Sequence, residues 1–288
     1  MKKCNKNTSS DLKKGLSNVK ITPVPIIIKW TGSKRISANE INSYFPNYNR
    51  YFEPFLGGGS LLYLNCHRPA IASDIYEPLI KLWILVRDNS DLVIKSYKDN
   101  WIKLQKKLPD YYYEVRARFN KYHDPLDLLF LSRTCVTGII RFNKTGEFNN
   151  SFHLSRKGIE PSKFSKIAQL WSYKIKGIIF RCVDYKIIFD ETKKGDFIYL
   201  DPPYAANKQR YIANLNTKEF FDCLRIINSK GVKYALSFDG LRDNVDFKTP
   251  FPNDLFKRHI FIYSGLSAVK KVLNGQTKRV TESLYLNY

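Results

Sequence analysis

The residues with the clearest chemical potential are the tetrapeptide Asp201-Pro202-Pro203-Tyr204, directly after the apolar run 197–200. Two prolines fix φ and remove backbone donors, so they end strand pairing and make the turn rigid. A rigid turn alone does not explain why an acid and an aromatic residue stand on either side of the prolines. The Asp201 carboxylate and the Pro202 carbonyl are two acceptors that could hold both protons of one amino group, and Tyr204 offers a stacking face.

These groups suit chemistry on the exocyclic amino group of a nucleobase. The lone pair of that nitrogen is delocalised into the ring, which makes it a poor nucleophile. Two hydrogen bonds would draw the nitrogen toward tetrahedral geometry and aim its lone pair at an electrophile, so that positioning does most of the work. A base flipped out of its stack could lie on Tyr204. Asp201 would then orient the amino group more than act as a strong base, because a proton leaves readily once the nitrogen is cationic.

A second set of residues lies where other predicted strands end. The run 51–55 leads into the Gly57–Gly59 turn, and two further runs end on Asp74 and Asp184. Ligands of open α/β sheets bind beyond the carboxyl ends of the strands. Glycines let the backbone approach a ligand, and a strand-terminal acid can accept hydrogen bonds from ribose hydroxyls, which predicts a site for an adenosine-containing cofactor. The spacing is not that of a dinucleotide fingerprint or a P-loop, and each feature alone is also typical of an ordinary turn.

The elements that must position these residues alternate between strands and helices. Helical patterns cover Pro78–Arg87 and Thr217–Ser229. Several strands are apolar on both faces, which is typical of a sheet covered by helices. The alternation predicts an α/β fold with an open, mostly parallel sheet and an antiparallel edge. The predicted strands are 51–55, 70–74, 177–183, 196–200, 233–237 and a late hairpin of 261–263 and 283–286.

A basic segment from about residue 91 to 176 interrupts this alternation. It contains two helical patterns, Tyr111–Lys121 and Pro125–Cys135, the second capped by Asp124. Residues 91–180 contain 17 Lys and Arg against 8 Asp and Glu, a net charge of +9. A basic insert between the strands of an α/β domain is a candidate recognition module. The expected division is a basic flexible tail (1–20), a catalytic domain (21–90 and 177–288) and the inserted domain (91–176).

The composition of the whole chain excludes several other classes. Its 288 residues carry a formal net charge of +22, which favours a polyanionic partner such as nucleic acid, although a lysine-rich composition alone would also produce it. Five scattered cysteines and four histidines lack the spacing of a disulfide framework or a metal centre. The first 20 residues lack the apolar core of a signal peptide, and no run reaches the roughly 18 apolar residues of a membrane span. We therefore expect a cytoplasmic protein that uses no metal and no membrane.

Three motifs occur in the order found in the alpha group of Dam-type DNA adenine-N6 methyltransferases, and the chain resembles that family over roughly residues 28–288. Three segments of the insert, 111–116, 127–133 and 138–149, closely resemble the modification methylase of the EcoRV system. The resemblance implies a Rossmann-like S-adenosylmethionine-dependent methyltransferase sheet with an inserted, mainly helical target-recognition domain. It also implies site-specific methylation of a flipped adenine in DNA. The three motifs are Lys29-Trp30-Thr31-Gly32-Ser33-Lys34, Glu53-Pro54-Phe55-Leu56-Gly57-Gly58-Gly59 and Asp201-Pro202-Pro203-Tyr204.

Members of this family bind S-adenosylmethionine, and the resemblance places their cofactor residues on this chain. The N-terminal motif would contact the cofactor through Trp30 and Lys34, for which a buried core aromatic and a solvated charge are the alternatives. Asp74 would hold the ribose, Asp184 would lie near the adenine, and Asp201 would lie between the cofactor and the target amino group. The implied cofactor residues are Trp30, Lys34, Glu53, Phe55, Gly57, Gly59, Asp74, Asp184 and Asp201, and the implied catalytic residues are Asp201, Pro202 and Tyr204.

The family reads DNA with a hairpin after the helical part of the insert, which corresponds to about residues 137–154. Arg141 is the first candidate for a base-edge contact, since Arg paired with guanine is the commonest specific contact, and Lys29 is the second. Four other cations are expected to contact phosphates, which position DNA without specifying its sequence. For Arg156 and Lys157, a solvated basic loop is the alternative. The expected phosphate contacts are Arg133, Lys144, Arg156 and Lys157, and the full DNA-binding set adds Lys29, Ile139, Arg141 and Asn143.

Some positions depart from the family pattern. Thr137 stands where Asn is common, Asn150-Ser151 where Val-Pro is frequent, and Ser33 where Gly is frequent. These changes leave the catalytic motifs intact. They affect the segment that would read DNA, so the family pattern does not fix the target sequence, although a target that contains GAT is expected.

The expected partners and the competing functions follow from the same resemblance. We expect a monomeric enzyme of prokaryotic or phage origin that acts on double-stranded DNA, with a cognate restriction endonuclease as a further candidate partner. Two alternative functions stay open at this point: methylation of RNA or another amine or amide, and DNA binding without catalysis.

Overall fold

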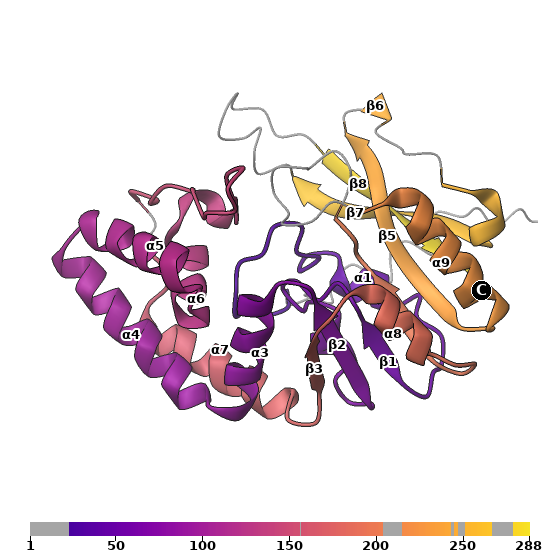
Figure 1. Ribbon diagram of the computed structural model, residues 1–288, viewed down its shortest axis with the longest axis horizontal. Helices are drawn as coiled ribbons and strands as arrows, with labels where there is room; N and C mark the ends of the chain where they lie inside the picture. The colour runs from indigo at the N-terminus through magenta and orange to yellow at the C-terminus, as the bar shows by residue number, and fades with distance from the viewer. Residues whose placement is uncertain (1–22, 156, 204–214, 243–244, 247–250, 267–278) are drawn as a thin grey trace, which may run out of the picture.

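The computed structural model describes residues 23–155, 157–203, 215–242, 245–246, 251–266 and 279–288, and the expected tail lies outside this part. The described strands form one eight-stranded sheet in the order β3-β2-β1-β4-β5-β8-β7, with β6 paired to β5 (Figure 1). The first five strands of this order are parallel, whereas β8 is antiparallel to both β5 and β7. The predicted parallel sheet with an antiparallel edge is thus confirmed. The strands are β1 (Tyr51–Glu53), β2 (Ala70–Asp74), β3 (Ile179–Cys182), β4 (Phe197–Leu200), β5 (Lys233–Arg242), β6 (Val245–Asp246), β7 (Arg258–Leu266) and β8 (Arg279–Leu286).

Side chains alternate across the sheet and build a core on each face. In β4, Phe197 and Tyr199 belong to one buried cluster, whereas Ile198 and Leu200 belong to the other. All four are buried, so the strand is apolar on both sides. A strand that is covered on both faces reads as a continuous apolar run, which is why the sequence pattern identified it.

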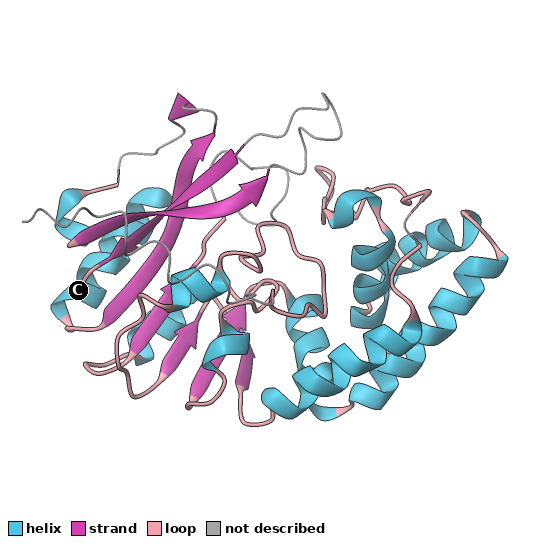
Figure 2. Cartoon of the chain, turned by 180° about the vertical axis from the view of Figure 1, so that it is seen from behind, coloured by secondary structure: helices cyan, strands magenta, loops and turns pink. Residues whose placement is uncertain are grey.

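Helices cover both faces of the sheet (Figures 1 and 2). Helices α8 and α9 contribute buried side chains to one core, and α1 to α7 contribute to the other. Within the described ranges, no helix combines the length and the apolar character needed to cross a membrane. The helices are α1 (Ala38–Asn42), α2 (Leu62–Asn65), α3 (Glu77–Asp88), α4 (Ser90–Lys106), α5 (Asp110–Tyr122), α6 (Pro125–Thr134), α7 (Pro161–Lys174), α8 (Tyr185–Glu191) and α9 (Thr217–Ser229), with short 3₁₀ turns at η2 (Val136–Gly138) and η4 (Asn253–Leu255).

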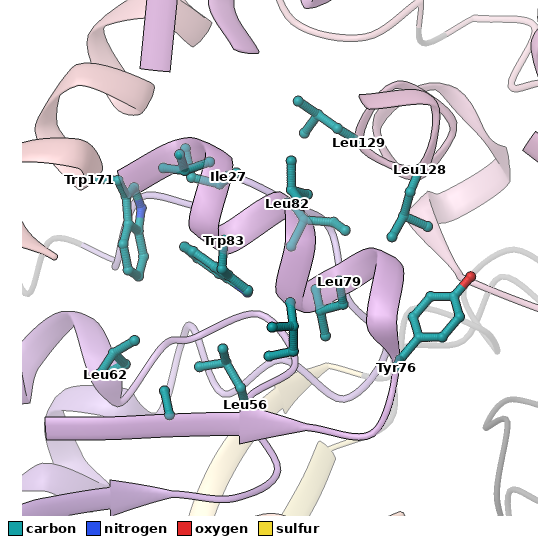
Figure 3. Close-up of a cluster of buried hydrophobic side chains, with 14 of the residues drawn as sticks. Ile27, Leu56, Leu62, Tyr76, Leu79, Leu82, Trp83, Leu128, Leu129 and Trp171 are labelled. Carbon is teal, nitrogen blue, oxygen red and sulfur yellow. The ribbon is translucent and has the colours of Figure 1, made fainter. Parts of the chain in front are cut away.

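The helices of the expected insert, α4 to α7, share the core of the sheet. Leu128 and Leu129 on α6 lie across from Leu82 on α3, and Trp83 on α3 packs against Trp171 on α7 with ring centroids 4.8 Å apart (Figure 3). All five side chains belong to the cluster that also covers one face of the sheet. The insert is therefore packed against the sheet through a continuous apolar layer.

The segment expected to be a hairpin, residues 137–154, is antiparallel but irregular. It begins within η2. One isolated bridge, between Phe142 and Phe148, lies inside the segment, and another joins its Phe152 to Cys135, which precedes it. Between the inner pair, Asn143 N donates to Glu147 O at 2.9 Å. We call residues 137–154 the recognition loop, after the role that the sequence leads us to expect of them.

The strand order reverses beside β1, which has β2 and β3 on one side and β4 and β5 on the other. In a parallel sheet, the ligand crevice opens at this reversal, beyond the carboxyl ends of the strands. Glu53 ends β1, and Asp201 directly follows β4. The topology thus brings these two acids to the edge where a ligand is expected.

Candidate active site

A cavity of about 330 Å³ lies at the carboxyl ends of the parallel strands. This volume is in the range of small-molecule sites, which begins near roughly 300 Å³. The structure brings all nine expected cofactor residues into its wall, although they come from five separate segments. These residues are Trp30, Lys34, Glu53, Phe55, Gly57, Gly59, Asp74, Asp184 and Asp201.

The glycine turn after β1 forms one wall and requires glycine at its first position. Gly57 has φ +48°, and a Cβ added there would lie 2.7 Å from Cδ1 of Trp30. The turn is fixed by its neighbours, because Gly57 N donates to Asp74 Oδ2 at 3.2 Å and Trp83 Nε1 donates to Gly57 O at 3.2 Å. Trp83 is fully buried, so the core anchors the backbone that faces the cavity.

Asp74 ends β2 and faces the cavity next to this turn. Burial raises the pKa of Asp74 to about 6, although backbone donors from Tyr76 and Gly57 oppose the shift. Tyr76 N donates to Asp74 Oδ1 at 3.1 Å, which holds the carboxyl group in place. A fixed, half-buried acceptor of this kind can bind ligand hydroxyls.

Glu53 is buried at the end of β1, 3 % exposed. Burial raises its pKa to about 8, and the nearby charge of Asp201 adds to the shift, whereas the hydrogen bond from Tyr51 opposes it. Tyr51 Oη donates to Glu53 Oε2 at 2.7 Å. With a pKa of about 8, the protonated form of Glu53 predominates at neutral pH.

Lys34 lies between two carboxylates. Its Nζ is 2.9 Å from Asp201 Oδ1 and 3.4 Å from Glu282 Oε2, and it donates to Gly32 O at 3.3 Å. Burial alone would lower the pKa of Lys34, but Asp201 and Glu282 outweigh it and raise the pKa well above its ordinary value. Lys34 is thus a buried cation, and the alternative of a solvated charge is wrong.

The aromatic wall of the cavity joins three segments. The rings of Trp30 and Tyr76 are 6.1 Å apart, and Tyr76 meets Phe142 of the recognition loop edge-on at 5.6 Å. Phe142 itself lines the cavity. Two hydrogen bonds between Thr31 Oγ1 and the backbone of Ile140 tie the N-terminal motif to the same loop, at 3.2 Å to its N–H and 3.4 Å to its carbonyl. The loop and the cavity are therefore in direct contact.

The remaining expected cofactor and catalytic residues fall in three positions. Asp184 caps α8, because its Oδ1 accepts from Lys186 N at 2.9 Å, and its side chain is exposed at the cavity edge. Pro203 also lines the cavity, and Pro202 is buried. Tyr204 lies outside the described residues.

The expected base-reading residues lie in or against the recognition loop. Arg141 is exposed, and its guanidinium is braced by Asn149 through hydrogen bonds of 2.8 Å to Oδ1 and 3.1 Å to O. The side chain of Lys29 lies against Gly138, which leaves no room there for a Cβ. Ile139 is half-buried in the same segment. A braced, outward-facing guanidinium is well placed for a contact with DNA.

The loop tip combines one exposed cation with an internally bonded turn. Lys144 is exposed. The side chain of Asn143 is used within the turn, since its Nδ2 donates to Glu147 Oε2 at 2.8 Å and its Oδ1 accepts from Thr145 N at 3.0 Å. Asn143 therefore shapes the tip. Lys157 is exposed, whereas Arg156 lies outside the described residues.

Arg133 is the exception among the expected phosphate contacts. It is only 3 % exposed, and its guanidinium donates to the carbonyls of Ile27, at 2.6 Å, and Ile26. Burial lowers the pKa of Arg133 to about 10. The expectation of a phosphate contact is wrong here, because this side chain fastens α6 to the segment before the N-terminal motif. Its position directly after the apolar run 128–131 was the sequence signal of burial.

Several residues in this site were not identified from the sequence. Glu282 comes from β8, 248 positions after its partner Lys34, and no local motif marks it. Tyr76, Phe142 and Tyr185 line the cavity, and their only sequence signal is that they adjoin expected site residues or strand ends.

Comparison with known proteins places these features in context. Residues 30–272 match the family model described as D12 class N6 adenine-specific DNA methyltransferase. The Type II methyltransferase M.MjaIII of Methanocaldococcus jannaschii is 29% identical over 252 residues, covering 76% of this chain and 85% of that protein. The DNA adenine methylase of Haemophilus influenzae is 33% identical over 187 residues, covering 63% and 64% respectively. The DNA adenine methylase of Escherichia coli K12 is 29% identical over 203 residues, covering 67% and 71%.

Among solved structures, the rRNA methyltransferase aviRa from Streptomyces viridochromogenes covers 88% of this chain and 85% of its own, with 13% identity and a TM-score of 0.36.

Proposed function

The chain belongs to the D12 class N6 adenine-specific DNA methyltransferases, and from this premise we propose how its cavity and its recognition loop divide the reaction. The protein is a DNA adenine-N6 methyltransferase. We propose that the cavity binds S-adenosylmethionine and that Asp201 holds the amino group of a flipped adenine beside it. We further propose that residues 91–176 form the target-recognition domain.

The shape of the cavity supports the cofactor proposal. A Cβ at Gly57 would collide with Trp30, so glycine at this position lets the turn and the indole ring form one closely packed wall of the cavity. The hydroxyl of Tyr76 is buried without a hydrogen-bond partner among the described residues, which leaves a donor for a bound group. Asp74 would accept from the ribose and Asp184 would lie near the adenine end. When bound, the cofactor supplies the electrophilic methyl group on its sulfonium.

Asp201 and the Pro202 carbonyl would hold the two amino protons of the target adenine. This grip weakens the delocalisation of the nitrogen lone pair into the ring and directs it at the methyl carbon, so that preorganised positioning lowers the barrier. As the nitrogen–carbon bond forms, the amino nitrogen becomes cationic and then loses a proton. Lys34 forms an ion pair with Asp201, with 2.9 Å between Nζ and Oδ1, and so fixes the position of this carboxylate.

The recognition loop supports site-specific reading of duplex DNA. Arg141 is exposed and braced by Asn149, which suits a bidentate contact with a guanine edge. Lys144 and Lys157 are exposed and would contact phosphates. We propose a target that contains GAT. The name Type II methyltransferase carried by one relative supports a role beside a restriction endonuclease.

The observation on which this proposal chiefly rests is that Asp201 lies at the strand-order reversal, in the wall of the same cavity as the glycine turn and Asp74. The test is methyl transfer from labelled S-adenosylmethionine to duplex DNA, single-stranded DNA and total RNA. Sequencing of the methylated positions in the duplex would give the target.

The expected result is labelling of adenine N6 in duplex DNA at one short sequence. Asp201→Ala should abolish turnover and retain DNA binding. Labelling of RNA alone would replace the proposal by the RNA alternative, and unchanged turnover of Asp201→Ala would remove the role of this carboxylate.

A further inference from the structure

A carboxylate from the far edge of the sheet reaches the catalytic cluster. Glu282 lies in β8, where it pairs with Gly240 of β5 and Ile262 of β7. Its side chain is 20 % exposed, the same as that of Asp201, and its Oε2 lies 3.4 Å from Lys34 Nζ. Strand β8 thus contributes a charged group to a site otherwise built from the parallel strands and the N-terminal motif.

Among the described residues, the ion pairs of this cluster join one cation to two carboxylates. Lys34, whose side chain is 3 % exposed, is within 4.0 Å of both Asp201 and Glu282. Glu53 also lies near Asp201, but burial raises its pKa to about 8, so its protonated form predominates at neutral pH. The sum of these charges is −1, and it would be zero if Glu282 were neutral.

We propose that Glu282 is a positioning residue that shares Lys34 with Asp201 and keeps this cluster net negative during methyl transfer. The inference rests on the proposed role of Asp201 in holding the target amino group. Without Glu282, these three groups would lose one negative charge, and the remaining Lys34–Asp201 ion pair, which has no net charge of its own, would attract a nearby cation more weakly.

The reaction creates the cation that such a cluster would stabilise. The amino nitrogen forms a bond to the methyl carbon, the carbon–sulfur bond breaks with its electron pair going to sulfur, and the positive charge passes to the nitrogen. A carboxylate that faces the nitrogen stabilises this charge most where water is excluded. Glu282 acts through Lys34, so it should affect the rate of methyl transfer more than the binding of either substrate.

The alternative is that Glu282 only anchors β8 by its contact with Lys34. Loss of such an anchor would lower the stability of the fold and leave the rate per folded site unchanged. The two roles are therefore separated by kcat, KM and thermal stability measured together.

The experiment compares wild type with Glu282→Gln, Glu282→Asp and the control Glu191→Gln. Glu191 forms an ion pair with Arg181 and does not line the cavity. The control therefore removes the same charge at a place without a proposed role in the reaction. Steady-state and single-turnover methylation of duplex DNA are measured with S-adenosylmethionine. Rates are normalised to the number of sites that bind this cofactor in a titration, so that a loss of folded protein does not affect them.

For Glu282→Gln we expect kcat and the single-turnover rate to fall by about tenfold or more, comparable with the loss of one preorganised electrostatic contact, while KM for both substrates stays close to wild type. Glu282→Asp should recover part of the rate because it keeps the charge, and Glu191→Gln should match wild type. A wild-type rate per site in Glu282→Gln would overturn the proposal, as would an equal loss in Glu191→Gln. Absence of DNA methylation by the wild type would reject the proposed function and this assignment with it.

Discussion

Buried acids give the cavity a pH response at the scale of single residues. Burial raises the pKa of Glu53 to about 8 and that of Asp74 to about 6. The hydroxyl of Tyr51 stabilises the charged form of Glu53, yet the surrounding core and Asp201 outweigh it. The protonation state of a side chain in this wall is thus set by the fold around it.

Glu53 should make the stability of the protein fall as the pH rises. Its folded pKa of about 8 lies above the value of about 4.3 for an exposed glutamate, so the folded state binds this proton more tightly. That stabilisation is complete below the unfolded pKa and is lost as the pH rises through the folded pKa. Glu53→Gln mimics the protonated form at every pH. Its unfolding free energy should therefore fall less than that of wild type between about pH 5 and 9, with a difference in slope of up to about 1.4 kcal/mol per pH unit.

Urea denaturation at several pH values measures this difference. Glu191→Gln, with its carboxylate at the surface, should follow the wild-type curve. Equal slopes for Glu53→Gln and wild type would show that Glu53 ionises normally.

Gly57 should be required for cofactor binding. In Gly57→Ala the new methyl group would lie 2.7 Å from Trp30 Cδ1, and the backbone would keep a left-handed φ of +48° that disfavours alanine. We expect the affinity for S-adenosylmethionine to fall by about tenfold or more, since strain of about 1–3 kcal/mol is typical of such sites. Isothermal titration measures the affinity. Gly177→Ala is the control, because no heavy atom lies within 4 Å of a Cβ added at Gly177, and it should bind S-adenosylmethionine as wild type does. An equal loss of affinity in both variants would contradict this role of the turn.

At the scale of elements, the end of α6 buries one arginine, whereas the recognition loop exposes another. Arg133 at the end of α6 is buried and donates to backbone carbonyls of Ile26 and Ile27. Arg141 in the loop is exposed and held by Asn149. The difference follows from the surroundings of the helix, because α6 is buried from Asp127 to Thr134, its polar residues included.

Replacing each arginine by alanine should separate stability from recognition. Arg133→Ala leaves two carbonyls without their donor, so we expect a loss of about 2–4 kcal/mol in unfolding free energy. Arg141→Ala should leave stability near that of wild type and weaken specific DNA binding by about 1–3 kcal/mol. Chemical denaturation and fluorescence anisotropy with a methylatable duplex measure the two quantities. A stable Arg133→Ala with weakened DNA binding would restore the phosphate contact expected from the sequence.

Phe142 should connect the recognition loop to cofactor binding. It lines the cavity and meets Tyr76 edge-on, so Phe142→Ala opens the wall. We expect weaker binding of S-adenosylmethionine in the absence of DNA, by about tenfold, which corresponds to about 1.4 kcal/mol. Leu154→Ala is the control, because Leu154 ends the same loop at 79 % exposure. Titration without DNA distinguishes them, and unchanged binding in Phe142→Ala would mean that the ring is dispensable.

The elements that could be predicted from the sequence are those whose run of apolar residues reflects their burial in the sheet. β4 and β2 were recognisable because they are apolar runs that end on Asp201 and Asp74, and the nine expected cofactor residues do meet in one cavity. An antiparallel segment does lie at residues 137–154, but its irregular backbone depends on side-chain hydrogen bonds such as those of Asn143, which no periodicity encodes, and its role in recognition stays a prediction. Contacts between distant segments, such as Lys34 with Glu282, depend on strand order and were not predictable from either segment.

At the scale of the whole molecule, the chain carries a net charge of +22, and its basic insert packs on one of the two apolar cores of the sheet. The helices that carry the basic insert pack into the same apolar cluster as one face of the sheet, so the cationic surface and the cavity are held in a fixed relation. This arrangement lets long-range attraction to DNA deliver a site to the catalytic edge.

DNA affinity should therefore depend strongly on salt. The logarithm of the affinity should fall linearly with the logarithm of the salt concentration, because bound phosphates release counterions. Lys144→Ala should reduce the slope by about one unit. Lys194→Ala, at the exposed turn before β4 and away from the carboxyl edge of the sheet, should leave the slope unchanged. Anisotropy titrations from low to physiological salt measure these slopes, and a flat response would mean that most of the charge is compositional.

The alternation of side chains in the recognition loop also limits how the enzyme can change during evolution. The side chain of Arg141 is exposed, whereas that of Ile140 is buried in the core and that of Phe142 lines the cavity. New target sequences can therefore arise through position 141 and the exposed tip at Lys144 without altering the catalytic machinery. Libraries that vary these outward positions and keep their inward neighbours offer the shortest route to a methyltransferase with a redesigned target.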